Sequence, residues 1–98
     1  MITHIVAFRW KPGIPPGHVA TVRSQLLEFV SSLPEVRSYR CGPDVGASEM
    51  QNFDFGIVAE FDSVDEWRVY DKHPRHEEIR GGVVRPWIET RASVQFES

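Results

Sequence analysis

Residues 53–61 read Phe-Asp-Phe-Gly-Ile-Val-Ala-Glu-Phe, and they decide the fold because they give the clearest strand pattern in the chain. Apolar residues occupy every second position, which is typical of a strand with one face buried in a core. The next residues, Ser63-Val64-Asp65-Glu66, fit a capping box, in which the serine hydroxyl and the glutamate carboxylate satisfy free backbone N–H groups at a helix start. The centre of the sequence therefore predicts a strand that leads directly into a helix.

Toward the N-terminus, the pattern predicts a strand, a helix and a second strand. Residues 2–10 alternate and are largely apolar on both faces, and the following loop ends the strand because consecutive prolines cannot donate to a ladder. Residues 19–33 carry apolar side chains at helical spacing, up to Pro34. Residues 36–41 contain β-forming residues and stop at Gly42-Pro43, so they predict the second strand.

Toward the C-terminus, the helix that begins at Ser63 runs to Pro74, and a short helix resumes over residues 75–79. Gly81-Gly82 weakens this second segment. Residues 88–96 alternate and predict a fourth strand. The resulting order βαββαβ predicts a ferredoxin-like α+β fold, with a four-stranded antiparallel sheet and both helices on one face.

The other face of this sheet has no helix to cover it. A contiguous apolar patch is rarely left exposed on a protein of this size, so we expect two copies to pair sheet against sheet into a dimeric α/β barrel. The last strand alternates strictly, and its polar residues predict a paired face that is mixed, held by backbone pairing and salt bridges as well as apolar burial. These polar residues are Glu89, Arg91, Ser93 and Gln95.

Composition limits the possible functions. The 98 residues fit one domain, residues 1–98, and a formal charge of −3 offers no basic face for nucleic acid. No apolar run reaches the length of a membrane span, and the N-terminal residues lack the charge order of a secretory signal. The single cysteine, Cys41, has no disulfide partner in the chain, which makes the cytoplasm the default expectation.

The most suggestive chemical cluster is residues 70–76, Tyr-Asp-Lys-His-Pro-Arg-His. Histidine titrates near neutral pH, and a tyrosine hydroxyl can hydrogen-bond a developing oxyanion, so Tyr70 and His76 are candidate catalytic residues and His73 is a candidate ligand contact. A packing role is the alternative, in which His73 caps a helix end, Tyr70 packs with its hydroxyl at the rim and His76 lies in the first turn of the next helix. Spacing alone does not choose between the two.

Two further residues are candidates for a pocket. His4 shares a strand face with Val6 and Phe8, where it either points into a sheet-lined cavity or is a satisfied core residue. Trp87 lies at the entry to the last strand, at a possible pocket mouth, or is a packing anchor. No metal site is predicted, because the break at Pro74 separates the available ligands and no fourth ligand is present.

Several of these segments together resemble one family, the stress-responsive α/β-barrel (Dabb) domain, over essentially the whole chain. The resemblance rests on residues 4–13, on Gly42-Pro43-Asp44-Val45, on Phe61-Asp62-Ser63 and, most specifically, on the spacing of Tyr70, His73-Pro74 and His76. It implies a ferredoxin-like protomer that pairs through its sheet, no cofactor, and functions that are mostly unassigned.

One branch of that family, the plant olivetolic acid cyclase, closes a linear polyketide by aldol condensation. Its catalytic pair resembles Tyr70 and His76, and its pocket histidine and tryptophan resemble His4 and Trp87. By this resemblance His76 would abstract a proton alpha to a carbonyl and Tyr70 would hold the enolate oxygen. Phe55 stands where the cyclase has a pocket histidine, which makes it a candidate ligand contact, and Arg23 in the first helix changes the pocket polarity.

Three functions remain open at this point. The first is a dimeric domain that binds a small, partly apolar molecule between sheet and helices without turning it over. The second is a cofactor-free enzyme of cyclase or lyase type. The third is a structural, stress-associated oligomer.

Overall fold

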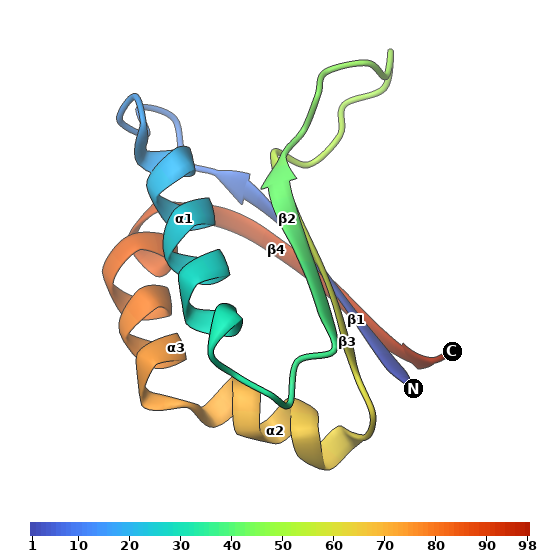
Figure 1. Ribbon diagram of the computed structural model, residues 1–98. Helices are drawn as coiled ribbons and strands as arrows, with labels where there is room; N and C mark the ends of the chain where they lie inside the picture. The colour runs from blue at the N-terminus through green and yellow to red at the C-terminus, as the bar shows by residue number, and fades with distance from the viewer.

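The computed structural model describes all residues from 1 to 98 and has the expected order of strands and helices (Figure 1). One four-stranded antiparallel sheet has the strand order β2-β3-β1-β4. The elements are β1 (Ile2–Trp10), α1 (His18–Ser31), β2 (Ser38–Pro43), β3 (Phe55–Phe61), α2 (Val64–Lys72), α3 (Pro74–Ile79), a π-helical turn η1 (Arg80–Val84), a 3-10 turn η2 (Arg85–Trp87) and β4 (Ile88–Glu97). The helices lie together on one side of the sheet (Figure 1), so the ferredoxin-like prediction is confirmed.

Local sequence explains where the second half of the chain bends. The Ser63 hydroxyl accepts a hydrogen bond from the Glu66 backbone N–H at 3.4 Å, which is the serine half of the predicted capping box. The Glu66 carboxylate accepts the Ser63 hydroxyl rather than a backbone N–H. His73 ends α2 and precedes Pro74, the first residue of α3, and its Nδ1 accepts the Arg75 backbone N–H at 3.0 Å. His73 therefore ends α2, as the packing alternative predicted, and its side chain caps the start of α3.

Some element ends differ from the prediction. β3 begins at Phe55 rather than at residue 53, and just before it the Asp54 carboxylate accepts the Trp10 backbone N–H at 2.9 Å, in place of a backbone oxygen. β2 begins at Ser38 rather than at residue 36. Gly81-Gly82 does not end the helical path, since both glycines lie inside η1, which continues α3.

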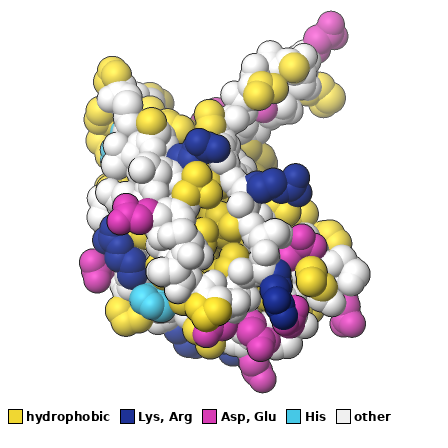
Figure 2. Space-filling model, viewed as in Figure 1, with side chains coloured by type: hydrophobic (Ala, Val, Ile, Leu, Met, Phe, Trp, Pro, Cys, Tyr) yellow, Lys and Arg dark blue, Asp and Glu magenta, His cyan; other side chains and the backbone are white.

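The core lies between the helix-side face of the sheet and α1. Alternate residues of the two central strands meet the apolar stripe of α1 and are almost fully buried, with exposed fractions of 8% or less. They are Val6, Phe8 and Trp10 of β1, Phe55, Ile57, Ala59 and Phe61 of β3, and Val22, Leu26 and Phe29 of α1. Figure 2 shows hydrophobic side chains gathered in the gap between α1 and β2, at the side of this core.

The register of β4 corrects one part of the prediction for the paired face, namely that the polar residues of this strand lie on it. Residues directly opposite in antiparallel strands share a face, and β4 pairs Arg91 with Phe8 and Gln95 with His4, both on the helix side. The polar set of β4 therefore faces the helices, and Ala92, Val94 and Phe96 lie on the open face. Polar residues are tolerated on the helix side here because β4 is an edge strand that borders a cavity rather than the packed core.

The open face is mixed, because Arg40 of β2 and Glu60 of β3 share it with an apolar strip that β4 extends. Val94 and Phe96 are 54% and 47% exposed, and Val94 pairs across the sheet with Ile5, which pairs in turn with Val58. The loop 44–54 projects beyond the end of the sheet as an arm (Figure 1) and exposes two further apolar side chains, Val45 and Met50. No helix of the chain is long and apolar enough to cross a bilayer.

Candidate functional site

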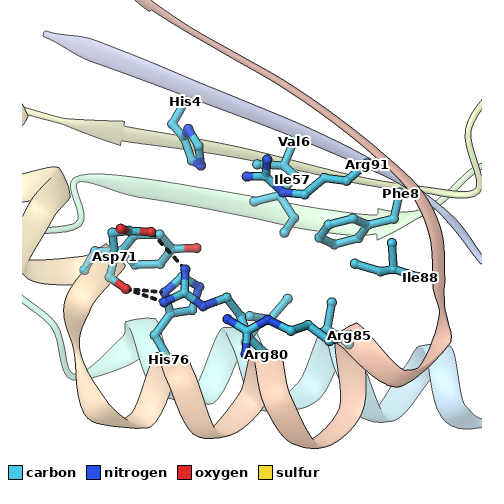
Figure 3. Close-up of a pocket in the computed structure, with 13 residues that line it drawn as sticks. His4, Val6, Phe8, Ile57, Asp71, His76, Arg80, Arg85, Ile88 and Arg91 are labelled. Atoms are coloured by element: carbon cyan, nitrogen blue, oxygen red, sulfur yellow. Dashed lines mark hydrogen bonds and ion pairs between the residues drawn. The ribbon is translucent and has the colours of Figure 1, made fainter.

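A cavity of about 200 Å³ lies between the helix-side face of the sheet and the helices (Figure 3). Its lining comes from every layer of the fold, and seven of its thirteen residues are hydrophobic. The lining residues are His4, Val6 and Phe8 of β1, Leu26 of α1, Ile57 of β3, Tyr70 and Asp71 of α2, His76 of α3, Arg80 and Val84 of η1, Arg85 of η2, and Ile88 and Arg91 of β4. Three of the residues singled out in the sequence, His4, Tyr70 and His76, are therefore brought together.

His76 is positioned as a neutral base. Its Nδ1 lies 3.2 Å from the backbone oxygen of Asp71, and because a carbonyl oxygen only accepts, Nδ1 donates and carries the ring proton. The other nitrogen, Nε2, has no hydrogen-bond partner in the chain and is not sealed from solvent. Burial, and then the charge of Arg80, lower the pKa of His76 to about 4, so its ring is neutral at neutral pH.

Tyr70 packs beside His76 and is held by a second tyrosine. The two rings have centroids 4.3 Å apart, and Phe29 stacks against both of them. The Tyr70 hydroxyl lies 3.1 Å from the hydroxyl of Tyr39 on β2. Burial raises the pKa of Tyr70 to about 12, and burial also raises the pKa of Tyr39, so both phenols are neutral donors at physiological pH.

His4 faces this pair across the cavity from β1. Its Nδ1 lies 3.0 Å from the amide nitrogen of Gln95, and because an amide nitrogen only donates, Nδ1 accepts and Nε2 carries the proton. Burial is the main cause of a lowered pKa for His4, and the nearby charge of Arg91 lowers it further. His4 is therefore a neutral ring that can donate a hydrogen bond, whereas His76 can accept one.

Three arginines complete the polar part of the lining. Arg80 is committed to Asp71, with 2.9 Å to the carboxylate and 2.7 Å to the backbone oxygen, and it also contacts Glu77 at 3.1 Å. Arg85 makes two hydrogen bonds to the Glu77 carboxylate, at 2.6 and 3.0 Å. Arg91 contacts only the hydroxyl of Ser93, at 3.1 Å.

The structure does not bring the other predicted ligand contacts to the cavity. Phe55 is 1% exposed and packs in the core, with its ring 5.8 Å from Trp10. His73 uses its Nδ1 in the helix cap and packs with its ring 5.0 Å from Phe29. Trp87 meets the ring of His18 at 6.0 Å.

Sequence reasoning missed Tyr39, Arg80, Arg91 and Gln95. Tyr39 and Gln95 reach the site only through strand pairing, which no local pattern reveals. Arg80 was passed over because the glycines after it suggested a helix end, although they continue the helical path. One usable signal was the polar set of β4, which becomes informative once its register against His4 is known.

Other reactive groups in the chain form no second site. No three histidine, cysteine, aspartate or glutamate side chains come close enough together to hold a metal ion. Cys41 is half-buried, and burial raises the pKa of its thiol, so it is not activated as a nucleophile. The titratable side chains that could act together on a ligand are therefore those that line the cavity.

Comparison with known proteins gives the context of this site. The family model described as Stress responsive A/B Barrel Domain (Dabb) matches residues 2–98. No curated protein sequence matches the chain. The chain belongs to the stress-responsive A/B barrel family.

Solved structures with the same fold include proteins of known and unknown function. A dimeric ferredoxin-like protein of unknown function from Thermobifida fusca is 34% identical with a TM-score of 0.90, and the match covers 99% of this chain and 90% of that one. A dimeric protein of unknown function from Bacteroides fragilis is 23% identical (TM-score 0.78, covering 99% and 95%). Hydroxynitrile lyase from Passiflora edulis is 18% identical (TM-score 0.82, covering 97% and 90%), a likeness that shows the fold alone.

Proposed function

We propose that this member of the stress-responsive A/B barrel family is a homodimer that binds a small, partly apolar molecule in the cavity between sheet and helices. The observation that carries the proposal is the cavity itself, in which an apolar lining surrounds a few convergent polar groups. This combination is typical of small-molecule sites. A volume of about 200 Å³ is below the roughly 300–1,000 Å³ of sites for drug-sized ligands, which favours a small ligand.

The open face of the sheet supports the homodimer. Ile5, Val58, Val94 and Phe96 form a contiguous apolar surface that a second copy of the same face would cover. The related protein from Thermobifida fusca is dimeric. Light scattering at micromolar concentration is expected to give twice the monomer mass, and a monomer would contradict this part of the proposal.

Binding is tested with a thermal-shift screen of small phenolic and polyketide-like compounds. The variant His76→Ala changes a residue that lines the cavity, and the matched control His73→Ala changes the other histidine of the same segment, which does not. We expect compounds that raise the melting temperature of the wild type and of H73A but not of H76A. Equal shifts for both variants would place the ligand elsewhere.

A second function, cofactor-free acid–base catalysis, is favoured by the free Nε2 of His76, whose ring lies 4.3 Å from the Tyr70 ring between centroids. A neutral imidazole with an open nitrogen can take a proton from a carbon alpha to a carbonyl. If Tyr39 donates its proton to Tyr70, the Tyr70 hydroxyl is free to donate to the enolate oxygen that forms. The protonated His76 then returns the proton to the product, so no other reactant is needed. A lyase occurs among the structural neighbours.

Catalysis is tested by following the exchange of the alpha protons of phenylacetone in D₂O by NMR. A catalytic site should exchange them faster than the same concentration of imidazole, and His76→Gln should lose roughly 10²–10⁴-fold of the acceleration. Tyr70→Phe should reduce the rate while leaving binding of phenylacetone nearly unchanged. Binding without any acceleration would indicate a ligand carrier. The absence of both binding and exchange would favour a purely structural oligomer.

A further inference from the structure

We infer that the ligand of this cavity carries a carboxylate, and that the guanidinium of Arg91 binds it. The inference rests on the proposed binding function and deepens it, because it names the chemical class of the ligand. It follows from the distribution of charges around the cavity and from the position of Arg91 in the sheet.

The charges that face the cavity do not balance. The lining contains three guanidinium groups and one carboxylate, Asp71, and Glu77 outside the lining adds a second carboxylate. Arg80 is paired with both acids, and Arg85 is paired through two hydrogen bonds with Glu77. Both histidines in the lining are held neutral by burial. One positive charge therefore remains, in a protein whose formal net charge is −3.

The remaining charge belongs to Arg91. Among the six ion pairs of the chain none includes this residue, and its only hydrogen bond goes to the neutral hydroxyl of Ser93. A planar guanidinium with free donors matches a carboxylate through two parallel hydrogen bonds. An arginine that lines a cavity without an acidic partner is therefore suited to an acidic ligand.

The register of β4 determines where this group acts. Arg91 stands opposite Phe8, on the helix side of the sheet, and Figure 3 shows its side chain extending from β4 across the sheet over Val6 and Ile57 in the direction of His4. The lowered pKa of His4 has the Arg91 charge among its causes, so the two groups lie close enough on this face of the sheet to interact. The Nε2–H of His4 is a second donor for the same anion.

This arrangement divides the cavity into two ends. A carboxylate held at Arg91 and His4 would place the rest of a small ligand against the apolar side chains of Phe8, Ile57 and Leu26. The opposite polar end is formed by Tyr70 and His76, on the helices. The ligand class is therefore a small aromatic or branched carboxylic acid in its ionised form.

A pair of probes of equal shape and different charge tests the inference. Benzoate carries the carboxylate and benzamide does not, so binding of each is measured by calorimetry to the wild-type dimer. We expect benzoate to bind at least tenfold more tightly than benzamide, and the difference to shrink as salt is added. In Arg91→Gln we expect benzoate to bind at least tenfold more weakly and benzamide to bind as before, and Arg91→Lys should restore part of the preference.

The matched control is Arg68→Gln, which removes an exposed arginine on α2 far from the cavity lining and should leave both affinities unchanged. Equal affinity of the wild type for the two probes, or an unchanged preference in R91Q, would overturn the carboxylate site while leaving the proposed binding function intact. Failure of both probes to bind the wild type would count against the carboxylate site and the pocket together. Circular dichroism of R91Q should match the wild type, because Arg91 is an exposed side chain without an ion pair.

Discussion

The two faces of one sheet differ in what covers them, although both are built from the same four strands. On the helix side, Phe55, Ile57 and Ala59 are 4% exposed or less. On the open side, Val94 and Phe96 are about half exposed. On β4 the usual arrangement is reversed, because its polar residues Arg91 and Gln95 face the helices and its apolar residue Val94 faces outward. The polar residues on the covered face border the cavity, and the exposed apolar residues on the bare face lie where we propose the dimer interface.

The covered face is itself divided between a packed region and a chemical region. Phe55, Ala59 and Phe61 of β3 pack in the core and do not line the cavity, whereas His4 of β1 and Arg91 of β4 do. In the chemical region polar side chains are held by other polar side chains, as in the pairs His4 with Gln95 and Tyr70 with Tyr39. Four experiments test the packed region, the open face and the chemical region, in order of decreasing expected effect.

The packed region is tested by Phe55→Ala. Removing this buried ring, which lies against Phe8 and Trp10, should reduce the free energy of unfolding by about 3–5 kcal/mol. Urea denaturation measures the change. A loss below about 1 kcal/mol, together with weakened ligand binding, would instead support a direct ligand contact for Phe55.

The open face is tested by Val94→Asp. Each dimer would bury two carboxylates in place of two valines, so we expect the dissociation constant to rise more than 100-fold, or about 3 kcal/mol. The matched control is Val69→Asp, the same change at a valine of similar exposure on α2. Sedimentation should show folded monomers for V94D and dimers for V69D, and dimers for both would place the interface elsewhere.

The chemical region is tested by the pH dependence of stability. His76 takes up a proton near pH 6.5 in the unfolded chain but only near pH 4 in the folded protein, so the unfolded state binds more protons in this window. Stability should therefore be full above about pH 6.5 and fall as the pH drops toward 4, by up to about 3 kcal/mol from this residue.

His76→Asn isolates this contribution. Asparagine keeps a donor for the Asp71 backbone oxygen but does not titrate, so the curve of the variant should fall less steeply between pH 6.5 and 4 than that of the wild type. Urea melts at each pH give both curves, and the difference between them removes the contribution of the carboxylates. Parallel curves would show that His76 is not buried as a neutral ring.

The hydrogen bond between the two tyrosines is tested by Tyr39→Phe. Losing the hydroxyl that pairs with Tyr70 should cost about 1 kcal/mol of stability, the usual net value of one hydrogen bond. A double-mutant cycle with Tyr70→Phe measures the coupling directly. Additive losses would mean that the two hydroxyls contribute independently.

Much of the fold was predictable because it depends on local patterns. Alternation in residues 2–10 and 88–96, the capping box at Ser63 and the break at Pro74 each specify an element from neighbouring residues alone. The main error came where a distant partner decided the outcome, since pairing with β1 turns the polar residues of β4 toward the helices. For the candidate site, the cluster of residues 70–76 pointed to Tyr70 and His76, which line the cavity, and also to His73, which is used in a helix cap.

The sequence by itself determined the order of the elements, the ferredoxin-like topology and the identity of the two titratable groups on the helices. Only the tertiary structure decided which face of β4 meets the helices, and therefore which residues join His4 and His76 at the cavity. The physical reason is that side-chain alternation in a strand has a period of two and is symmetric between the faces. Strand register and helix packing break that symmetry, and they place Arg91 inside the cavity and Val94 on the open face.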